Sequence, residues 1–271
     1  LNCSQWTARK YDKSVSKEVE TTHQAKDSGR YNKLLVPAAA LKPIANCIGK
    51  IRTYHETVTL PWMNDGQRIL PAKLFMEYTQ QMRVMKAEFD TLVNEFVNHY
   101  PTLIKEARLS LGTMYNPSDY PAVDVIRAKF SVGTRFEPIP TAEDFRVDIS
   151  EADVAAIQSD IKLNLHNQQK EALQHCWDRL RDVVSKIEER LSDPEAIFRD
   201  SLIENARSLV KILPALNLLE DPELEAARCA VEHRLCMISP QRLRDNKAIR
   251  AQTAQAAGEI LQRMTAYAVA A

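Results

Sequence analysis

The sequence predicts a mainly α-helical protein: a long antiparallel, coiled-coil-like helical hairpin with a small β-containing insert at its tip, and a short β-hairpin and C-terminal helices at its base. Residues 74–111 and 154–191 each place an apolar residue every three or four positions, which keeps one face of a helix apolar. Because the two stripes have the same length, we expect helices that pack head to tail over about 55 Å. Only six glycines occur among 271 residues, which argues against a loop-rich or phosphate-binding protein.

This hairpin divides the chain into three predicted parts. Residues 1–70 form a basic N-terminal segment with short helices and a β-hairpin. Residues 71–192 form the helical hairpin, with the β-containing insert at 112–150. Residues 193–271 form C-terminal helices that dock on the base of the hairpin.

Within the N-terminal part, the residues predict short helices over about 13–25 and 34–50, the second broken by two prolines. Residues 51–62 are rich in Thr, Val and Tyr, which favours a strand. The sequence Asn64-Asp65-Gly66 is a strong turn signal. Residues 68–71 would be the return arm of a small β-hairpin.

The first long helix is expected to open at Pro71 and to stop at Gly112. Pro101 should kink or split it, because proline removes a backbone donor and clashes with the preceding turn. In the insert, residues 129–137 and 146–149 alternate between apolar and polar side chains. The insert is therefore predicted to hold two short strands that pair with each other.

For the second long helix, Ser150 fits an N-cap. Three later helices have a capping residue followed by proline, which suits the first helical position. These helices are predicted at about 194–213, 222–237 and 240–268, after Asp193, Asp221 and Ser239.

Charge and cysteine content suggest a cytoplasmic protein. The net charge is zero, but residues 1–55 carry ten Lys or Arg against four Asp or Glu, which is weak support for an anionic partner. The five cysteines are odd in number and irregularly spaced, as in proteins with reduced thiols. We expect no contact with a membrane, since no stretch has the 18 or more apolar residues that would span one.

The sequence offers one metal-binding pattern and no catalytic one. Cys229, His233 and Cys236 fall on one helix face and could ligate zinc together with a fourth ligand. The same spacing is ordinary for residues buried in a helical core, which is the interpretation that we favour, and the sequence does not decide between them. No catalytic residue and no cofactor are predicted.

Two sets of residues are candidates for binding a partner. Aromatic residues of the insert could contact a partner protein at the tip of the hairpin; they are Tyr115, Tyr120, Phe130, Phe136 and Phe145. Basic and aromatic residues alternate near the N-terminus, as in proteins that bind single-stranded nucleic acid; they are Trp6, Arg9, Lys10, Tyr11, Lys13, Lys17, Arg30 and Lys33. A solvated, lysine-rich helix is the ordinary alternative for the second set.

Several short strings resemble those of an uncharacterised family encoded by tailed bacteriophages and integrative mobile elements. The similarity extends to about residue 190 and rests on Thr59-Leu60-Pro61-Trp62, on 65–71, on Leu111-Gly112, on Asp119-Tyr120-Pro121, on Pro138-Ile139-Pro140 and on 144–147. The resemblance implies a protein of the host-cell cytoplasm, often encoded near MoxR-type ATPases or recombination genes. It implies no established activity and no catalytic residues.

The sequence thus predicts a non-enzymatic, self-associating scaffold protein of a phage or mobile element. It would form a homo-oligomer and bind a protein partner, with a MoxR-type ATPase as one candidate. The alternative is a protein of phage DNA metabolism that binds single-stranded DNA through the basic N-terminal segment. The scaffold hypothesis starts from a long apolar stripe that one partner helix does not fully cover.

Overall fold

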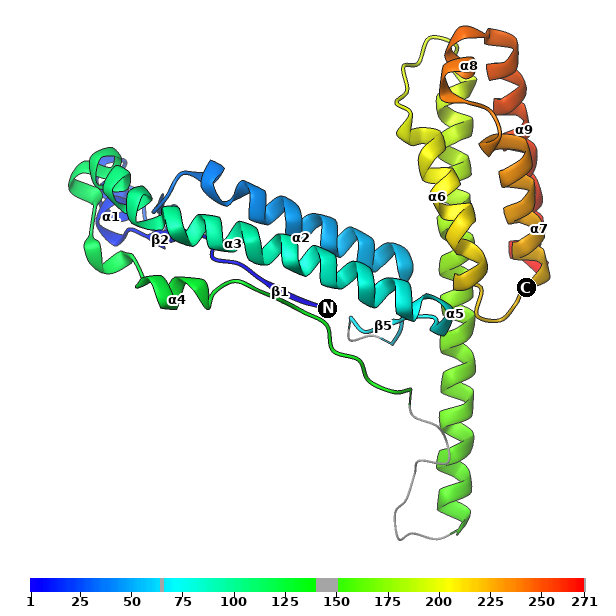
Figure 1. The fold of residues 1–271 in the computed structure, drawn as a ribbon, viewed down its shortest axis with the longest axis horizontal. Helices are drawn as coiled ribbons and strands as arrows, with labels where there is room; N and C mark the ends of the chain where they lie inside the picture. The colour runs from blue at the N-terminus through cyan, green and yellow to red at the C-terminus, as the bar shows by residue number, and fades with distance from the viewer. Residues whose placement is uncertain (64–65, 140–150, 271) are drawn as a thin grey trace. The chain divides into compact units, whose positions relative to one another are not determined.

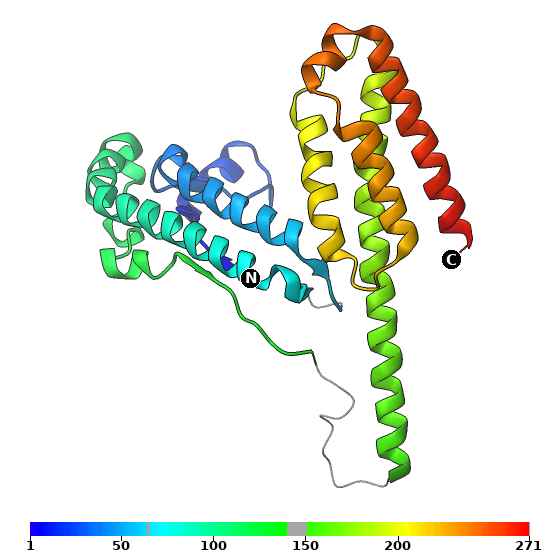
Figure 2. The same ribbon diagram turned by 45° about the vertical axis from the view of Figure 1, so that its right-hand side comes forward.

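The chain folds into two compact units, each drawn from two separate stretches of sequence (Figures 1 and 2). The computed structural model describes residues 1–63, 66–139 and 151–270. Unit 1 consists of Leu1–Glu56 and Glu77–Glu137, and unit 2 of Thr57–Met76 and Pro138–Ala271. The mainly α class is confirmed. The bounds of the two units differ from those of the three predicted parts.

Two antiparallel helices, α2 (Ala38–Val58) and α3 (Phe75–Leu111), lie side by side and form the centre of unit 1 (Figure 1). Cys47 Sγ of α2 lies 4.0 Å from the carbonyl oxygen of Met85 in α3. The rings of Tyr54 and Tyr78 stack with their centroids 6.0 Å apart. The core contains apolar residues at helical spacing on both helices, including Ile44, Ile48 and Ile51 of α2 and Tyr78, Phe89, Phe96 and Tyr100 of α3.

Short strands and turns pack around these helices. Strand β1 (Asn2–Ser4) pairs antiparallel with β6 (Ser131–Gly133), and β2 (Arg9–Tyr11) pairs antiparallel with β3 (Asn32–Leu34). Helix α1 (Lys13–Thr22) follows β2 and is capped by the side chain of Asp12, which accepts from two backbone N–H groups. After α3 come two 3-10 turns, η2 (Gly112–Met114) and η3 (Pro117–Asp119), and the short helix α4 (Val123–Arg127).

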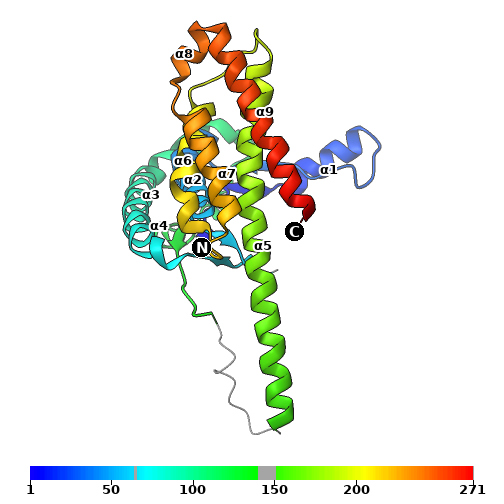
Figure 3. The ribbon, with the colours of Figure 1, turned by 90° about the vertical axis from the view of Figure 1, so that its right-hand side faces the viewer.

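Unit 2 combines a β-hairpin with a helical bundle. Strands β4 (Leu60–Pro61) and β5 (Arg68–Ile69) form the predicted hairpin, with Leu60 opposite Ile69, and the 3-10 turn η1 (Ala72–Leu74) follows it. The bundle surrounds the C-terminal half of α5 (Figure 3). Its elements are α5 (Glu151–Ser192), α6 (Ser201–Leu216), α7 (Pro222–Val231), the π-helical turn η5 (Glu232–Cys236), α8 (Pro240–Asp245) and α9 (Lys247–Ala270). None of the helices in the described ranges is long and apolar enough to cross a membrane.

The predicted pairing of the two long helices as one hairpin is wrong. Helix α3 belongs to unit 1 and α5 to unit 2. The apolar face of α3 is buried among elements of unit 1, whereas that of α5 is covered by α6, α7 and α9. An apolar stripe shows that a helix face is buried but not which element buries it, so two stripes of equal length need not be partners.

Three local predictions in unit 1 also need correction. Residues 51–58 belong to α2 and not to a strand, because Ile51 and Val58 continue the buried helical spacing of Ile44 and Ile48. Helix α3 is continuous through Pro101, so the split that was one of the two predicted outcomes does not occur. Strand β6 is shorter than the predicted strand 129–137 and pairs with β1. Its predicted partner, 146–149, lies outside the described residues, as does Ser150.

In unit 2, two of the three proline-marked helix starts are confirmed. Asp221 and Ser239 cap α7 and α8 as predicted. Asp193 does not start a helix: its Oδ1 accepts from the N–H of Glu195 in a turn, and α6 begins only at Ser201. The predicted helix 240–268 is divided at Asn246, whose side chain accepts from two backbone N–H groups at the start of α9.

The C-terminal end of α5 depends on a single buried arginine from α9. Arg250 is 7% exposed, and its guanidinium donates to the carbonyl oxygens of Arg190 (2.9 Å), Leu191 (3.3 Å), Asp193 and Ala196 (2.8 Å). The last carbonyl groups of a helix have no partner within it, and a cation there is favoured by the helix dipole. One side chain therefore ends α5 and fixes the loop that follows.

We predict that Arg250→Met lowers the free energy of unfolding by about 3 kcal/mol, because several buried carbonyl groups lose their donor. Urea unfolding followed by circular dichroism measures this change. The matched control is Lys247→Met, an exposed cation near the start of the same helix, which should change stability by less than about 0.5 kcal/mol. Equal losses in the two variants would contradict the role given to Arg250.

Candidate functional site

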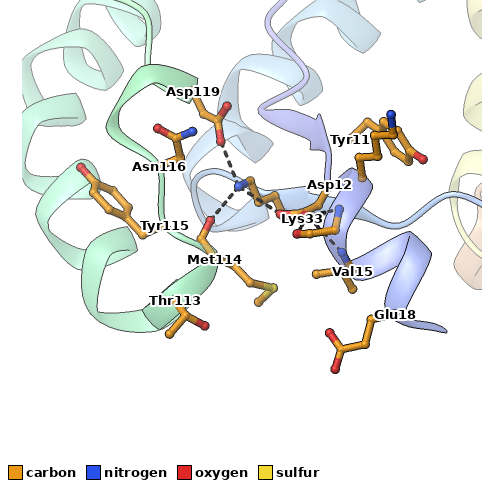
Figure 4. Close-up of a pocket in the computed structure, with 12 residues that line it drawn as sticks. Tyr11, Asp12, Val15, Glu18, Lys33, Thr113, Met114, Tyr115, Asn116 and Asp119 are labelled. Carbon is orange, nitrogen blue, oxygen red and sulfur yellow. Dashed lines mark hydrogen bonds and ion pairs between the residues drawn. The ribbon is translucent and has the colours of Figure 1, made fainter. Parts of the chain in front are cut away.

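Lys33 of unit 1, predicted to contact nucleic acid, is instead buried in an ion-pair cluster. Its side chain lies between Asp12 Oδ2 (3.2 Å) and Asp119 Oδ2 (2.9 Å), and Nζ donates to the carbonyl oxygen of Met114 at 2.6 Å (Figure 4). Lys33 is 5% exposed. It therefore joins β3 to the turns that follow α3 and is not available to a phosphate, which corrects the prediction.

The cluster forms the floor of an open hollow of about 560 Å³ in unit 1. The hollow is lined by Tyr11, Asp12, Lys13, Ser14, Val15, Glu18, Lys33, Thr113, Met114, Tyr115, Asn116 and Asp119. Burial by itself lowers the pKa of Lys33, but the hydrogen bonds and charges of Asp119 and Asp12 outweigh it and raise that pKa. The amine stays an ammonium at neutral pH, so it is neither a base nor a nucleophile.

Asp12 links the same cluster to helix α1. Hydrogen bonds from Ser14 and from the backbone N–H of Val15, with a further contribution from Lys33, lower the pKa of Asp12 to about 2. The carboxylate thus serves both as the N-cap of α1 and as a partner of a buried cation. These roles are structural.

The other residues predicted to bind nucleic acid separate into two groups. The ring of Trp6 contacts the rings of Phe96 (6.3 Å) and Tyr100 (5.8 Å), so it is already part of the packing of unit 1. The remaining six side chains are exposed, and Arg30 lies over the ring of Tyr11 at 5.8 Å. These six are Arg9, Lys10, Tyr11, Lys13, Lys17 and Arg30.

Most of the aromatic residues predicted to meet a partner protein pack within unit 1. The Tyr120 hydroxyl donates to the carbonyl oxygen of Leu35 (2.9 Å), and the ring of Tyr115 lies 5.4 Å from that of Tyr120. Phe130 is buried against Phe96. Phe136 is 50% exposed, with its ring against Tyr78, and Phe145 lies outside the described residues. The described part of the insert, up to residue 139, therefore does not gather these rings on one surface.

The cysteine and histidine pattern of unit 2 does not assemble a metal site. No group of three or more His, Cys, Asp or Glu side chains in the described part of the chain is placed to hold a metal ion. Cys229 Sγ contacts Glu225 and Arg228, and His233 Nδ1 lies 2.8 Å from the carbonyl oxygen of Cys229. Cys236 is buried, and burial raises the pKa of its thiol to about 11.

A second hollow in unit 2, between α6, α7 and η5, is lined by arginines that already have partners. Arg228 forms ion pairs with Glu225 (2.8 Å) and Glu232 (2.7 Å). Arg207 donates to the carbonyl oxygens of Cys236 and Ile238. We regard this hollow as the seam between packed helices.

The other helices of the bundle pack on the C-terminal half of α5 and not on its N-terminal half. From Ala172 to the end of the helix, one residue in every turn is almost completely buried: Ala172, Cys176, Leu180, Val184, Ile187 and Leu191. Over 153–171 no residue is fully buried. Figures 1 and 3 show this half of α5 extending beyond α6, α7 and α9.

The apolar face nevertheless continues along the N-terminal half of α5, on the same side of the helix. An eleven-residue spacing, which sequence reasoning missed, relates Val154, Leu165, Cys176 and Ile187, and likewise Ile161, Ala172 and Val183. Eleven residues make close to three whole helical turns, so the stripe runs almost straight. The N-terminal half of α5 therefore presents the same apolar face that α6, α7 and α9 bury along the C-terminal half.

We name Val154, Ile157, Ile161 and Leu165 the α5 stripe. All four side chains are half-buried, although no helix of the described part of unit 2 runs alongside them. Leu163 lies about 200° around the helix from Ile161 and is 58% exposed. The β4–β5 hairpin reaches α5 where this stripe ends, with the N–H of Met63 donating to Gln168 Oε1 at 2.7 Å.

Comparison with known proteins adds no assignment, since no protein-family model, no curated protein and no solved structure matches the chain.

We predict that Lys33→Met lowers the free energy of unfolding by about 3 kcal/mol, because it leaves two carboxylates without the cation that they share. Lys10 faces Lys33 across the β2–β3 pair but is exposed, so Lys10→Met is the control. Urea unfolding compares the two variants. A loss in Lys33→Met no larger than that in the control would show that the cluster is not a structural lock.

The pH dependence of stability gives a separate prediction for Asp12. Because its pKa in the folded state is about 2, below the ordinary value of 3.8, its contribution is present above about pH 4 and is lost as the pH falls toward 2. Asp12→Asn should therefore be less stable than the wild type at pH 7, with the difference disappearing near pH 2. Urea midpoints at pH 7, 4 and 2 measure it, and a constant difference would contradict the prediction.

Proposed function

We propose that this chain is a non-enzymatic interaction protein that associates with a second copy of itself through the α5 stripe. The carrying observation is the straight apolar face of α5, whose C-terminal half forms the core of the bundle while its N-terminal half extends past the bundle. A helix half with such a face is marginal in water unless another element covers it.

The magnitude of the burial favours a reversible association. Four half-buried aliphatic side chains from each copy would gain about 1 kcal/mol each on full burial, or about 8 kcal/mol in total. Loss of translational and rotational freedom opposes this by about 4 kcal/mol or more. We therefore expect a dimer that forms at high protein concentration and dissociates on dilution.

Several side chains that could carry chemistry have structural roles, which supports a non-enzymatic function. Lys33 and Asp12 are committed to the ion-pair cluster, and Arg207 and Arg228 to the bundle. Burial raises the pKa of the Cys176 thiol to about 11, which makes a thiolate nucleophile unfavourable.

Other aspects of the function stay predictions. The origin in a phage or mobile element and the MoxR-type ATPase as partner rest on the resemblance alone. Binding of single-stranded nucleic acid would now depend on the exposed set around Tyr11 and Arg30, without Trp6 and Lys33.

We predict that Ile161→Asp weakens self-association by about a hundredfold or more, since each dimer would bury two charges in place of two aliphatic side chains. Leu163→Asp makes the same chemical change on the opposite face of the same helix and should associate like the wild type. Sedimentation velocity over a concentration series gives the dissociation constants. A wild-type chain that stays monomeric at the highest concentration would refute the proposed function.

A further inference from the structure

We infer that the two copies pair with their α5 helices antiparallel, related by a two-fold axis that passes beside Ile161. This inference rests on the proposed function and adds the orientation and register of the partner. It makes the interface isologous, so that each copy presents the same surface to the other.

The spacing of the stripe is symmetric about Ile161. Successive positions Val154, Ile157, Ile161, Leu165 and Gln168 are separated by three, four, four and three residues. Reversing the helix about Ile161 therefore places Ile157 opposite Leu165 and Val154 opposite Gln168. Three of the four stripe residues then meet stripe residues of the partner, and Val154 lies opposite Gln168, next to the β4–β5 hairpin.

The surrounding elements exclude the parallel arrangement. The α5 stripe lies on the face that α6 and α9 cover further along the helix. Cys176 Sγ lies 3.6 Å from the carbonyl oxygen of Leu216, at the end of α6. A parallel partner would continue along the same face and collide with these helices. An antiparallel partner runs away from α6 and α9 along the stripe, and its Val154 reaches Gln168, where the β4–β5 hairpin contacts α5.

The charged residues beside the α5 stripe favour the parallel orientation, but only weakly. Asp160 and Lys162 lie about 100° to either side of Ile161 and are exposed. Antiparallel pairing brings Asp160 near the partner's Asp160 and Lys162 near the partner's Lys162, whereas parallel pairing would join unlike charges. Exposed pairs of this kind contribute little and are screened by salt, while overlapping helices are forbidden. Steric overlap therefore determines the orientation of the partner. Because like charges meet in the antiparallel dimer, association should strengthen as salt is added.

Disulfide cross-linking in the chain of 271 residues tests the register. The partly exposed Cys3 and Cys229 are first replaced by serine in every variant. Ile157→Cys and Leu165→Cys are then oxidised separately and as an equimolar mixture, at a concentration where the parent chain is dimeric. Non-reducing electrophoresis measures the cross-linked dimer, and circular dichroism shows that each variant is folded.

In the antiparallel register, each cysteine variant alone keeps its two thiols about 12 Å apart along the helices, too far for a disulfide. The mixture brings unlike cysteines opposite each other and should give about tenfold more cross-linked dimer than either variant alone. Efficient cross-linking of Ile157→Cys with itself, or none in the mixture, overturns the inference while the dimer, and thus the proposed function, still stands. A monomeric parent chain removes both.

Discussion

The eleven-residue spacing of apolar side chains along α5 is the constraint from which unit 2 follows. Because the spacing is close to a whole number of helical turns, a helix of 42 residues keeps one straight apolar face. Along Ala172 to Leu191 this face is the core on which α6 and α9 pack. On the N-terminal side of Gln168 the same face continues without a neighbouring helix in the described part of unit 2. The spacing that builds the bundle therefore also leaves a surface for association.

Buried cations complete both units, and each is satisfied by oxygen atoms of the chain. In unit 2, the buried cation is Arg250, which holds the end of α5. In unit 1, Lys33 joins β3 to the turns after α3. Desolvating such groups is unfavourable unless they are fully paired, and each of these cations joins segments that lie far apart in the sequence.

Local signals in the sequence were sufficient for much of the fold but not for its long-range pairings. The caps at Asp221 and Ser239, the end of α3 at Gly112 and the hairpin around residues 60–69 follow from side chains within a few positions. The burial of Lys33 in an ion-pair cluster does not follow from such local signals, because its partner Asp119 lies 86 positions further along the chain. The apolar pattern of α5 was readable as well. Which part of it lacks a covering helix depends on the lengths of α6 and α9, which the sequence of α5 does not contain.

The interleaved order of the two units affects how the chain can fold during synthesis. Residues 57–76 belong to unit 2, but Met63 and Thr59 are made 105 and 120 residues before the residues of α5 that they contact. Contacts between such distant positions form late, because a long loop must close first. The β4–β5 hairpin thus leaves the ribosome without its binding surface, and a truncated product that ends before α5 would leave its apolar side chains open to aggregation.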